Sequence, residues 1–143
     1  MSAREEGLTI GTRNRTTGSR SIAGILAYAP AVLWAAFLLY LGSRTWDGLE
    51  YPDLLPMPDK VVHFTLYGVL GLLAVLGWRR AGRRPVLWVP LLLALAVGTA
   101  DELQQRGVPT RSADVYDWVA DATAIAAAFA VLGRRASPRA KAK

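Results

Sequence analysis

The chain has 143 residues, enough for one domain of ordinary size. Hydrophobic residues make up 52% of it and charged residues 20%, a balance that excludes disorder for most of the chain. Cysteine is absent, which excludes disulfides, cysteine-ligated metals and thiol nucleophiles. The net charge of +6 is typical of nucleic-acid partners. The basic residues, however, lie between long apolar runs, and this distribution indicates a membrane protein with no nucleic-acid partner.

Four apolar segments are predicted to cross a bilayer, because its hydrocarbon core of about 30 Å needs about 20 helical residues. The first segment carries no charge and is expected to be one uncleaved helix with a modest kink at Pro30. The predicted fold class is all-α, an integral membrane four-helix bundle that occupies 21–133 as one domain. The approximate spans are 22–42, 61–78, 86–103 and 115–133.

Basic residues orient these helices, since cytoplasmic loops and tails carry an excess of Lys and Arg. Thirteen of the 17 basic residues lie in the N-terminal tail 1–20, in the loop 79–85 or in the C-terminal tail 134–143. Both termini are therefore predicted to be cytoplasmic, in a multi-pass protein of the inner (cytoplasmic) membrane. The N-terminal tail is rich in Arg, Ser, Thr and Gly and is predicted to be disordered.

Small residues mark one expected helix contact. Ala120, Ala124 and Ala128 repeat at four-residue spacing on the fourth segment. Gly68 and Gly71 offer a matching flat surface on the second. Small side chains in such rows let the backbones of membrane helices approach closely.

Polar residues on the second, third and fourth segments are spaced by three or four positions, so each set shares one helix face near the outer end. Ionisable groups inside a membrane usually turn inward and pair. The three sets therefore predict an outward-facing polar pocket, in which Arg111 is the natural counter-charge for the carboxylates. The predicted pocket residues are Asp59, Lys60, His63, Tyr67, Glu102, Gln105, Arg111, Asp114, Asp117 and Asp121.

Several chemistries suit such a set. One His with several carboxylates can hold a divalent cation, and carboxylate pairs can act as acids and bases. The sequence has no His-Glu-x-x-His signature, Gly-rich phosphate loop or Gly-x-Ser-x-Gly elbow, so no metal, cofactor or catalytic residue is predicted. A purely structural alternative is that the buried polar groups hydrogen-bond across helices and hold the bundle together.

Four motifs follow one another along the chain: an Asp-Lys-x-x-His-Phe-x-x-Tyr run over 59–67, a Glu-x-x-Gln pair over 102–105, a Pro-Thr-Arg turn over 109–111 and an Asp-x-x-Asp-x-x-x-Asp stretch over 114–121. In this order they resemble the signature of VanZ-like membrane proteins. The resemblance covers about 59–133, with one further apolar helix ahead of it. Two departures are Thr110 in place of the usual Gly of the turn and Asp121 where Asn is common.

This resemblance implies a small integral membrane protein of the cell envelope. The named family member is associated with low-level resistance to teicoplanin, but the resemblance does not by itself assign that phenotype to this chain. We expect a non-enzymatic protein whose pocket binds a polar group, such as the head of a lipid-linked cell-wall intermediate or a membrane-protein partner. The alternative is a membrane enzyme, metal-assisted or not, that acts on a lipid head group through His63 and either Glu102 or Asp117.

Overall fold

The structure is a computed structural model that describes residues 22–45, 58–82, 86–108 and 114–134. All regular secondary structure in these ranges is helical. The predicted N-terminal tail 1–20, the predicted C-terminal tail 134–143 except for Arg134, and the predicted pocket residue Arg111 lie outside the described residues. The helices are α2 (Ala29–Gly42), α3 (Pro58–Arg80), α4 (Trp88–Gln105) and α5 (Val115–Arg134).

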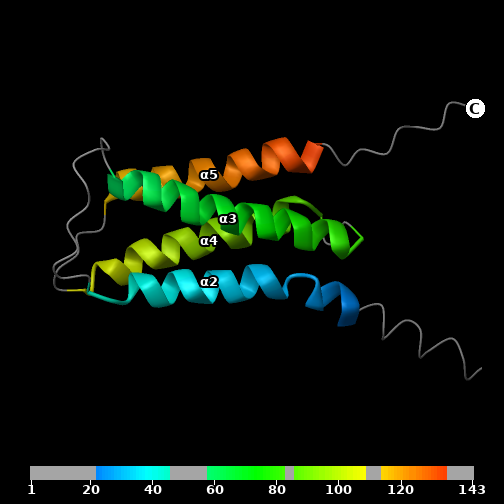
Figure 1. The fold of residues 1–143 in the computed structure, drawn as a ribbon, viewed down its shortest axis with the longest axis horizontal. Helices are drawn as coiled ribbons and strands as arrows, with labels where there is room; N and C mark the ends of the chain where they lie inside the picture. Colours follow the sequence, from blue (N-terminus) through cyan, green and yellow to red (C-terminus); the bar gives the residue numbers. More distant parts are fainter. Residues whose placement is uncertain (1–21, 46–57, 83–85, 109–113, 135–143) are drawn as a thin grey trace, which may run out of the picture.

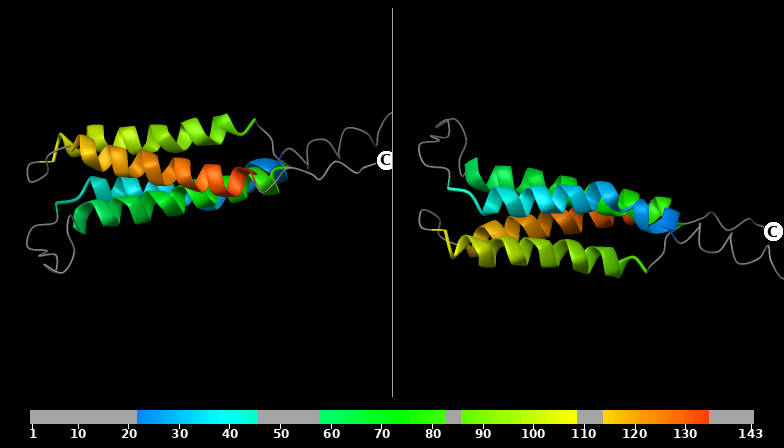
Figure 2. Two further views of the ribbon diagram at one scale, coloured as in Figure 1. Left: turned by 90° about the horizontal axis from the view of Figure 1, so that it is seen from above. Right: turned by 90° about the horizontal axis from the view of Figure 1, so that it is seen from below.

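These helices lie side by side, and helices that follow each other in the chain run in opposite directions (Figure 1). Two further views show α2 with α3 in one layer and α4 with α5 in the other (Figure 2). The most extensive packing joins α3 to α5 across the layers. The ends of α2 and α4 and the starts of α3 and α5 gather at one end of the bundle, which we name the polar end.

The first predicted span differs from the expectation of one continuous helix. Residues 22–26 form a short helical segment, 27–28 form a turn, and α2 begins only at Ala29. Pro30 explains the break, because its ring would clash with the carbonyl of Leu26 in a continuous helix and it has no N–H to donate. In the first turn of α2, where Pro30 lies, proline is well tolerated. The predicted modest kink is therefore wrong, and the segment is divided.

Two helices among the described residues are long and apolar enough to cross a membrane, over Asp59–Arg80 in α3 and Val115–Gly133 in α5. The apolar helix α2 is shorter, at 14 residues, which corresponds to about 21 Å of helix. The remaining helix, α4, has 18 residues and carries Asp101 and Glu102 near its end. The helices extend slightly beyond the predicted spans 61–78 and 115–133, and α4 is shifted toward the C-terminus relative to 86–103.

Side-chain hydrogen bonds tie the helices to one another in pairs. Each uses a donor from one helix and an oxygen of another, so the bundle is held by directed contacts as well as by its apolar core. The bonds are Trp34 Nε1 to Leu66 O (3.0 Å), Gln104 Nε2 to Leu39 O (2.8 Å), Trp118 Nε1 to Thr99 Oγ1 (3.1 Å) and Arg79 Nη2 to Leu132 O.

The contact between α3 and α5 is close because small residues line it. A Cβ built on Gly68 would lie 3.8 Å from Ala124 Cβ, which is ordinary contact. A Cβ on Gly71 would lie 2.9 Å from Ala128 Cβ and 3.0 Å from Ile125 Cα, which leaves no room for it. The predicted contact between the alanine row and the two glycines is confirmed.

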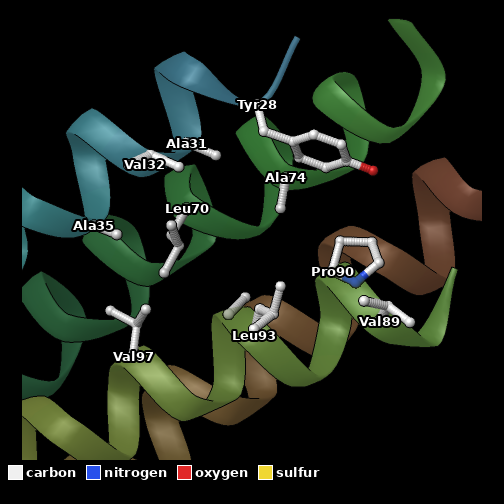
Figure 3. A pocket seen from close by; sticks show the side chains of 11 residues that line it. Tyr28, Ala31, Val32, Ala35, Leu70, Ala74, Val89, Pro90, Leu93 and Val97 are labelled. Carbon is white, nitrogen blue, oxygen red and sulfur yellow. The ribbon is translucent and has the colours of Figure 1, made fainter. Parts of the chain in front are cut away.

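An apolar groove lies between α2, α3 and α4 in the half of the bundle away from the polar end (Figure 3). Its volume is about 200 Å³. Residues that line the groove include Tyr28, Ala31, Leu70, Ala74, Leu93 and Val97.

The close α3–α5 contact predicts opposite effects for two neighbouring substitutions. We expect Gly71→Ala to lower the free energy of unfolding by about 1–3 kcal/mol, because the added methyl meets helix backbone. Gly68→Ala has room for its methyl and should leave stability unchanged or raise it by about 0.5–1 kcal/mol through helix propensity. Thermal unfolding of both variants in detergent measures the difference. Equal melting temperatures for the two variants would contradict the packing described.

Candidate functional site

Five polar or charged side chains are buried near the polar end, each with at most 7% of its surface exposed. They come from α4 and α5, and further polar residues of α3 face them. The sequence spacing explains this arrangement, because positions three or four apart lie on one helix face. The five are Asp101, Glu102, Gln105, Asp117 and Asp121.

We name the polar cluster as these five residues together with Asp59, Lys60, His63, Tyr67 and Asp114. It contains nine of the ten pocket residues predicted from the sequence; the tenth, Arg111, lies outside the described residues. The cluster divides into three groups, centred on Lys60, on His63 and on Tyr67. The first joins α3 to α5, the second joins α3 to both α4 and α5, and the third joins α3 to α4.

In the first group, Lys60 Nζ donates hydrogen bonds to three carboxylates. The acceptors are Asp59 at 2.7 Å, Asp114 at 2.8 Å and Asp117 at 2.6 Å. An ammonium has three N–H donors, so all of them are used. The Lys60 and Asp117 side chains are largely buried, whereas Asp59 and Asp114 reach solvent. The observed counter-charge for this acidic set is Lys60; the predicted role of Arg111 stays a prediction.

The pairing with Lys60 also acts on Asp114, which immediately precedes α5. The hydrogen bond from Lys60 holds the pKa of the Asp114 carboxyl below its ordinary value. A carboxyl with a lowered pKa in the folded state stabilises that state at neutral pH, and its contribution is lost as pH falls through the lowered pKa. The link between the start of α5 and α3 is therefore present at neutral pH.

The second group places His63 beside two acidic residues. His63 Nδ1 and Asp121 Oδ1 are 3.1 Å apart, and the imidazole donates when Nδ1 carries the proton. One nitrogen of His63 and one carboxylate oxygen each from Glu102 and Asp121 lie within 4.8 Å of one another. Glu102 Oε1 and Asp121 Oδ2 are buried and have no hydrogen-bond partner among the described residues. This group therefore holds two acceptors that nothing in the described part of the chain satisfies.

In the third group, two donors meet one carboxylate oxygen. The Tyr67 hydroxyl donates to Asp101 Oδ2 at 2.8 Å, and Gln105 Nε2 donates to the same oxygen at 3.1 Å. The other oxygen, Asp101 Oδ1, lies against the end of α2, where a Cβ on Gly42 would come within 1.7 Å of it. Glycine at position 42 is thus what allows α2 to approach α4 here.

Asp101 is the member of the cluster that the sequence reasoning missed. It is 4% exposed and accepts both hydrogen bonds of the third group. The signal that finds it is its spacing, since Asp101 precedes Gln105 by four residues and so shares its helix face. The predicted pair of Glu102 and Gln105, at three-residue spacing, occupies the same side of α4.

The charges of the polar cluster determine what it can bind. Carboxylates outnumber basic groups, and the ammonium of Lys60 is already shared among three of them. The buried atoms of the cluster that have no hydrogen-bond partner among the described residues are all acceptors: Asp101 Oδ1, Glu102 Oε1 and Asp121 Oδ2. Burial of an unpaired carboxylate oxygen is costly, so the cluster favours a ligand that supplies hydrogen-bond donors or positive charge.

No family model, curated protein or solved structure matches the chain. The resemblance to VanZ-like proteins therefore stays a prediction. Functional inference depends on the geometry of the polar cluster and on the surface that surrounds it.

The Lys60 group predicts a large effect from the loss of one charge. In Lys60→Met, three carboxylates face one another without a cation, and we expect the free energy of unfolding to fall by about 3 kcal/mol, as for removal of one partner of a buried pair. The control is Arg44→Met, which removes an exposed cation that contacts the Tyr40 hydroxyl and ring and should cost less than about 1 kcal/mol. Asp117→Asn added to Lys60→Met should restore part of the loss in thermal unfolding. Equal losses in the Lys60 and Arg44 variants would contradict the described pairing.

Proposed function

We propose that the chain is a multi-pass protein of the inner membrane whose polar cluster faces outward and binds a polar group of a lipid-linked or cell-wall-related molecule. The observation that carries the proposal is the inverted distribution of its side chains. Carboxylates are buried between the helices, whereas large apolar side chains cover the outside of the same helices.

The apolar exterior supports the membrane setting. Leu33 on α2 is 71% exposed, Leu93 on α4 is 63% exposed, and Val131 on α5 is 54% exposed. Soluble monomers rarely expose large contiguous apolar surfaces, and lipid tails supply the missing apolar partner. In this proposal α2 and α4 cross together with α3 and α5, which completes a four-helix membrane bundle.

The basic residues support the orientation. Arg79 and Arg80 end α3 at the end of the bundle opposite the polar cluster. The start of α2 and the end of α5, which adjoin the basic tails, lie at that same end (Figure 1). Because basic segments stay in the cytoplasm, both termini are cytoplasmic in this proposal and the polar cluster opens on the outer side.

The unsatisfied acceptors support the ligand class. Glu102 Oε1 and Asp121 Oδ2 would accept hydrogen bonds from hydroxyl, amide or ammonium groups, which are abundant in the sugar and peptide parts of cell-wall molecules. A lipid-linked molecule would approach within the membrane and present its head group at the outer end. The VanZ-like motifs agree with an envelope role, and resistance to teicoplanin is not part of the proposal.

Cysteine labelling tests the orientation, because the chain has no cysteine of its own. Arg106→Cys lies at the polar end and Val86→Cys at the opposite end, and both positions are exposed. In intact spheroplasts an impermeant maleimide should label the first variant and should label the second only after the membrane is permeabilised. The reverse pattern would place the polar cluster in the cytoplasm and overturn the outward-facing pocket.

Lipid retention tests the ligand. Protein purified in mild detergent and analysed by native mass spectrometry should retain a polyprenyl-linked cell-wall intermediate. Retention should fall about tenfold or more in Glu102→Leu, since a hydrogen bond to a charged group contributes about 1.5–3 kcal/mol. Arg44→Met, an exposed change at the same end of the bundle, is the control and should retain the lipid. Identical bound lipids in the wild type and in Glu102→Leu would contradict the proposed role of the cluster.

A further inference from the structure

Three side chains from three helices converge in the second group of the polar cluster. His63 comes from α3, Glu102 from α4 and Asp121 from α5. One potential ligand atom from each lies within 4.8 Å of the other two. Atoms bonded at about 2.1 Å to one ion can be at most about 4.2 Å apart, so an ion at the centre requires side-chain shifts of less than about 1 Å.

The unsatisfied oxygens give an independent reason to expect a cation. Asp121 is 1% exposed and Glu102 is 7% exposed. One oxygen of each, Asp121 Oδ2 and Glu102 Oε1, has no hydrogen-bond partner among the described residues. Lys60 does not neutralise them, because its three donors point to Asp59, Asp114 and Asp117. Two buried carboxylates with free oxygens beside an imidazole are costly unless a positive charge joins them.

We propose that His63, Glu102 and Asp121 bind one divalent transition-metal ion, of the class of Zn²⁺ or Mn²⁺, between α3, α4 and α5. Imidazole favours ions such as Zn²⁺, and carboxylates favour Mn²⁺ as well, whereas Ca²⁺ and Mg²⁺ prefer sites built from oxygens alone. Three protein ligands leave at least one coordination position open. The site therefore has the composition of a centre that binds an external group.

Neighbouring residues lie beside the three ligands and would not bind the ion themselves. The Tyr67 ring is parallel to the His63 ring, with an interplanar angle of 6° and centroids 6.2 Å apart. A Cβ at position 98 of α4 would lie 3.8 Å from Asp121 Oδ2, which is ordinary contact, so α4 packs closely beside this ligand. Groups around the ligands orient them and tune the affinity of metal sites.

The ion deepens the proposed function and rests on it for its biological role. It would take the place of external hydrogen-bond donors at Glu102 and Asp121, and the head group would then bind at the ion through an anionic group. A phosphate of a lipid-linked molecule could then occupy the open coordination position. Cation binding itself is measured without lipid, so the two proposals fail separately.

The experiment uses the full chain in detergent, freed of metal with a chelator and titrated with Zn²⁺ and, separately, Mn²⁺. Calorimetry should give one ion per chain, and the melting temperature should rise with added ion, because a ligand of the folded state stabilises it. Asp121→Asn and His63→Ala should each lower affinity by about a hundredfold or more. Arg44→Met, an exposed change at the same end of the bundle and outside the polar cluster, is the control and should bind as the wild type does.

Two further measurements keep the test decisive. The melting temperature of each variant without metal shows whether it folds, so weakened binding by a folded Asp121→Asn protein supports the site. Substitution of Co²⁺ gives a visible absorption band that should disappear in His63→Ala. The absence of a stoichiometric ion in the wild type, or unchanged affinity in Asp121→Asn, would overturn the metal site. Metal binding without lipid retention would support this site and contradict only the proposed function.

Discussion

The pairing of Lys60 and His63 on α3 with the acidic face of α5 fixes how these two helices lie against each other. Lys60 bonds to Asp117 at 2.6 Å, and His63 meets Asp121 at 3.1 Å. Successive residues of a helix are about 100° apart around its axis, so a rotation of α5 by one residue would remove both partners. Toward the other end, the same two faces carry the glycines and alanines that allow close approach. Charge and shape thus specify one register.

Much of this arrangement could be predicted from spacing alone. The helical segments follow from the length of the apolar runs, and the inward stripes and the glycine–alanine contact follow from residues three or four positions apart. The break before Pro30 was underestimated, because neighbouring helices decide whether a membrane helix tolerates proline as a kink or is divided by it. The predicted spans 22–42 and 86–103 also contain helices that are short or polar at one end, which apolar run length alone does not reveal.

The identity of each polar partner was harder to predict, since it depends on how helices rotate about one another. Spacing shows that Glu102 shares a face with Gln105, but it cannot show that one carboxylate oxygen of Glu102 lies near His63 while Asp101 takes the hydrogen bond of Gln105. Spacing also does not single out Lys60 as the cation that contacts three carboxylates; the predicted role of Arg111 lies outside the described residues. The unsatisfied oxygens that suggest a metal ion become visible only when three helices are placed together.

The division of charge between α3 and α5 has a consequence for how the protein is made. In the proposed membrane setting, an aspartate costs about 2.5–3.5 kcal/mol to insert at the centre of a helix and less toward the interface, and α5 contains Asp117 and Asp121 in its first half. Because α3 precedes α5 in the chain, Lys60 and His63 are synthesised first and are in place when the acidic helix leaves the ribosome. Insertion of α5 is then coupled to a partner already present, so the order of helices along the chain sets the order of assembly.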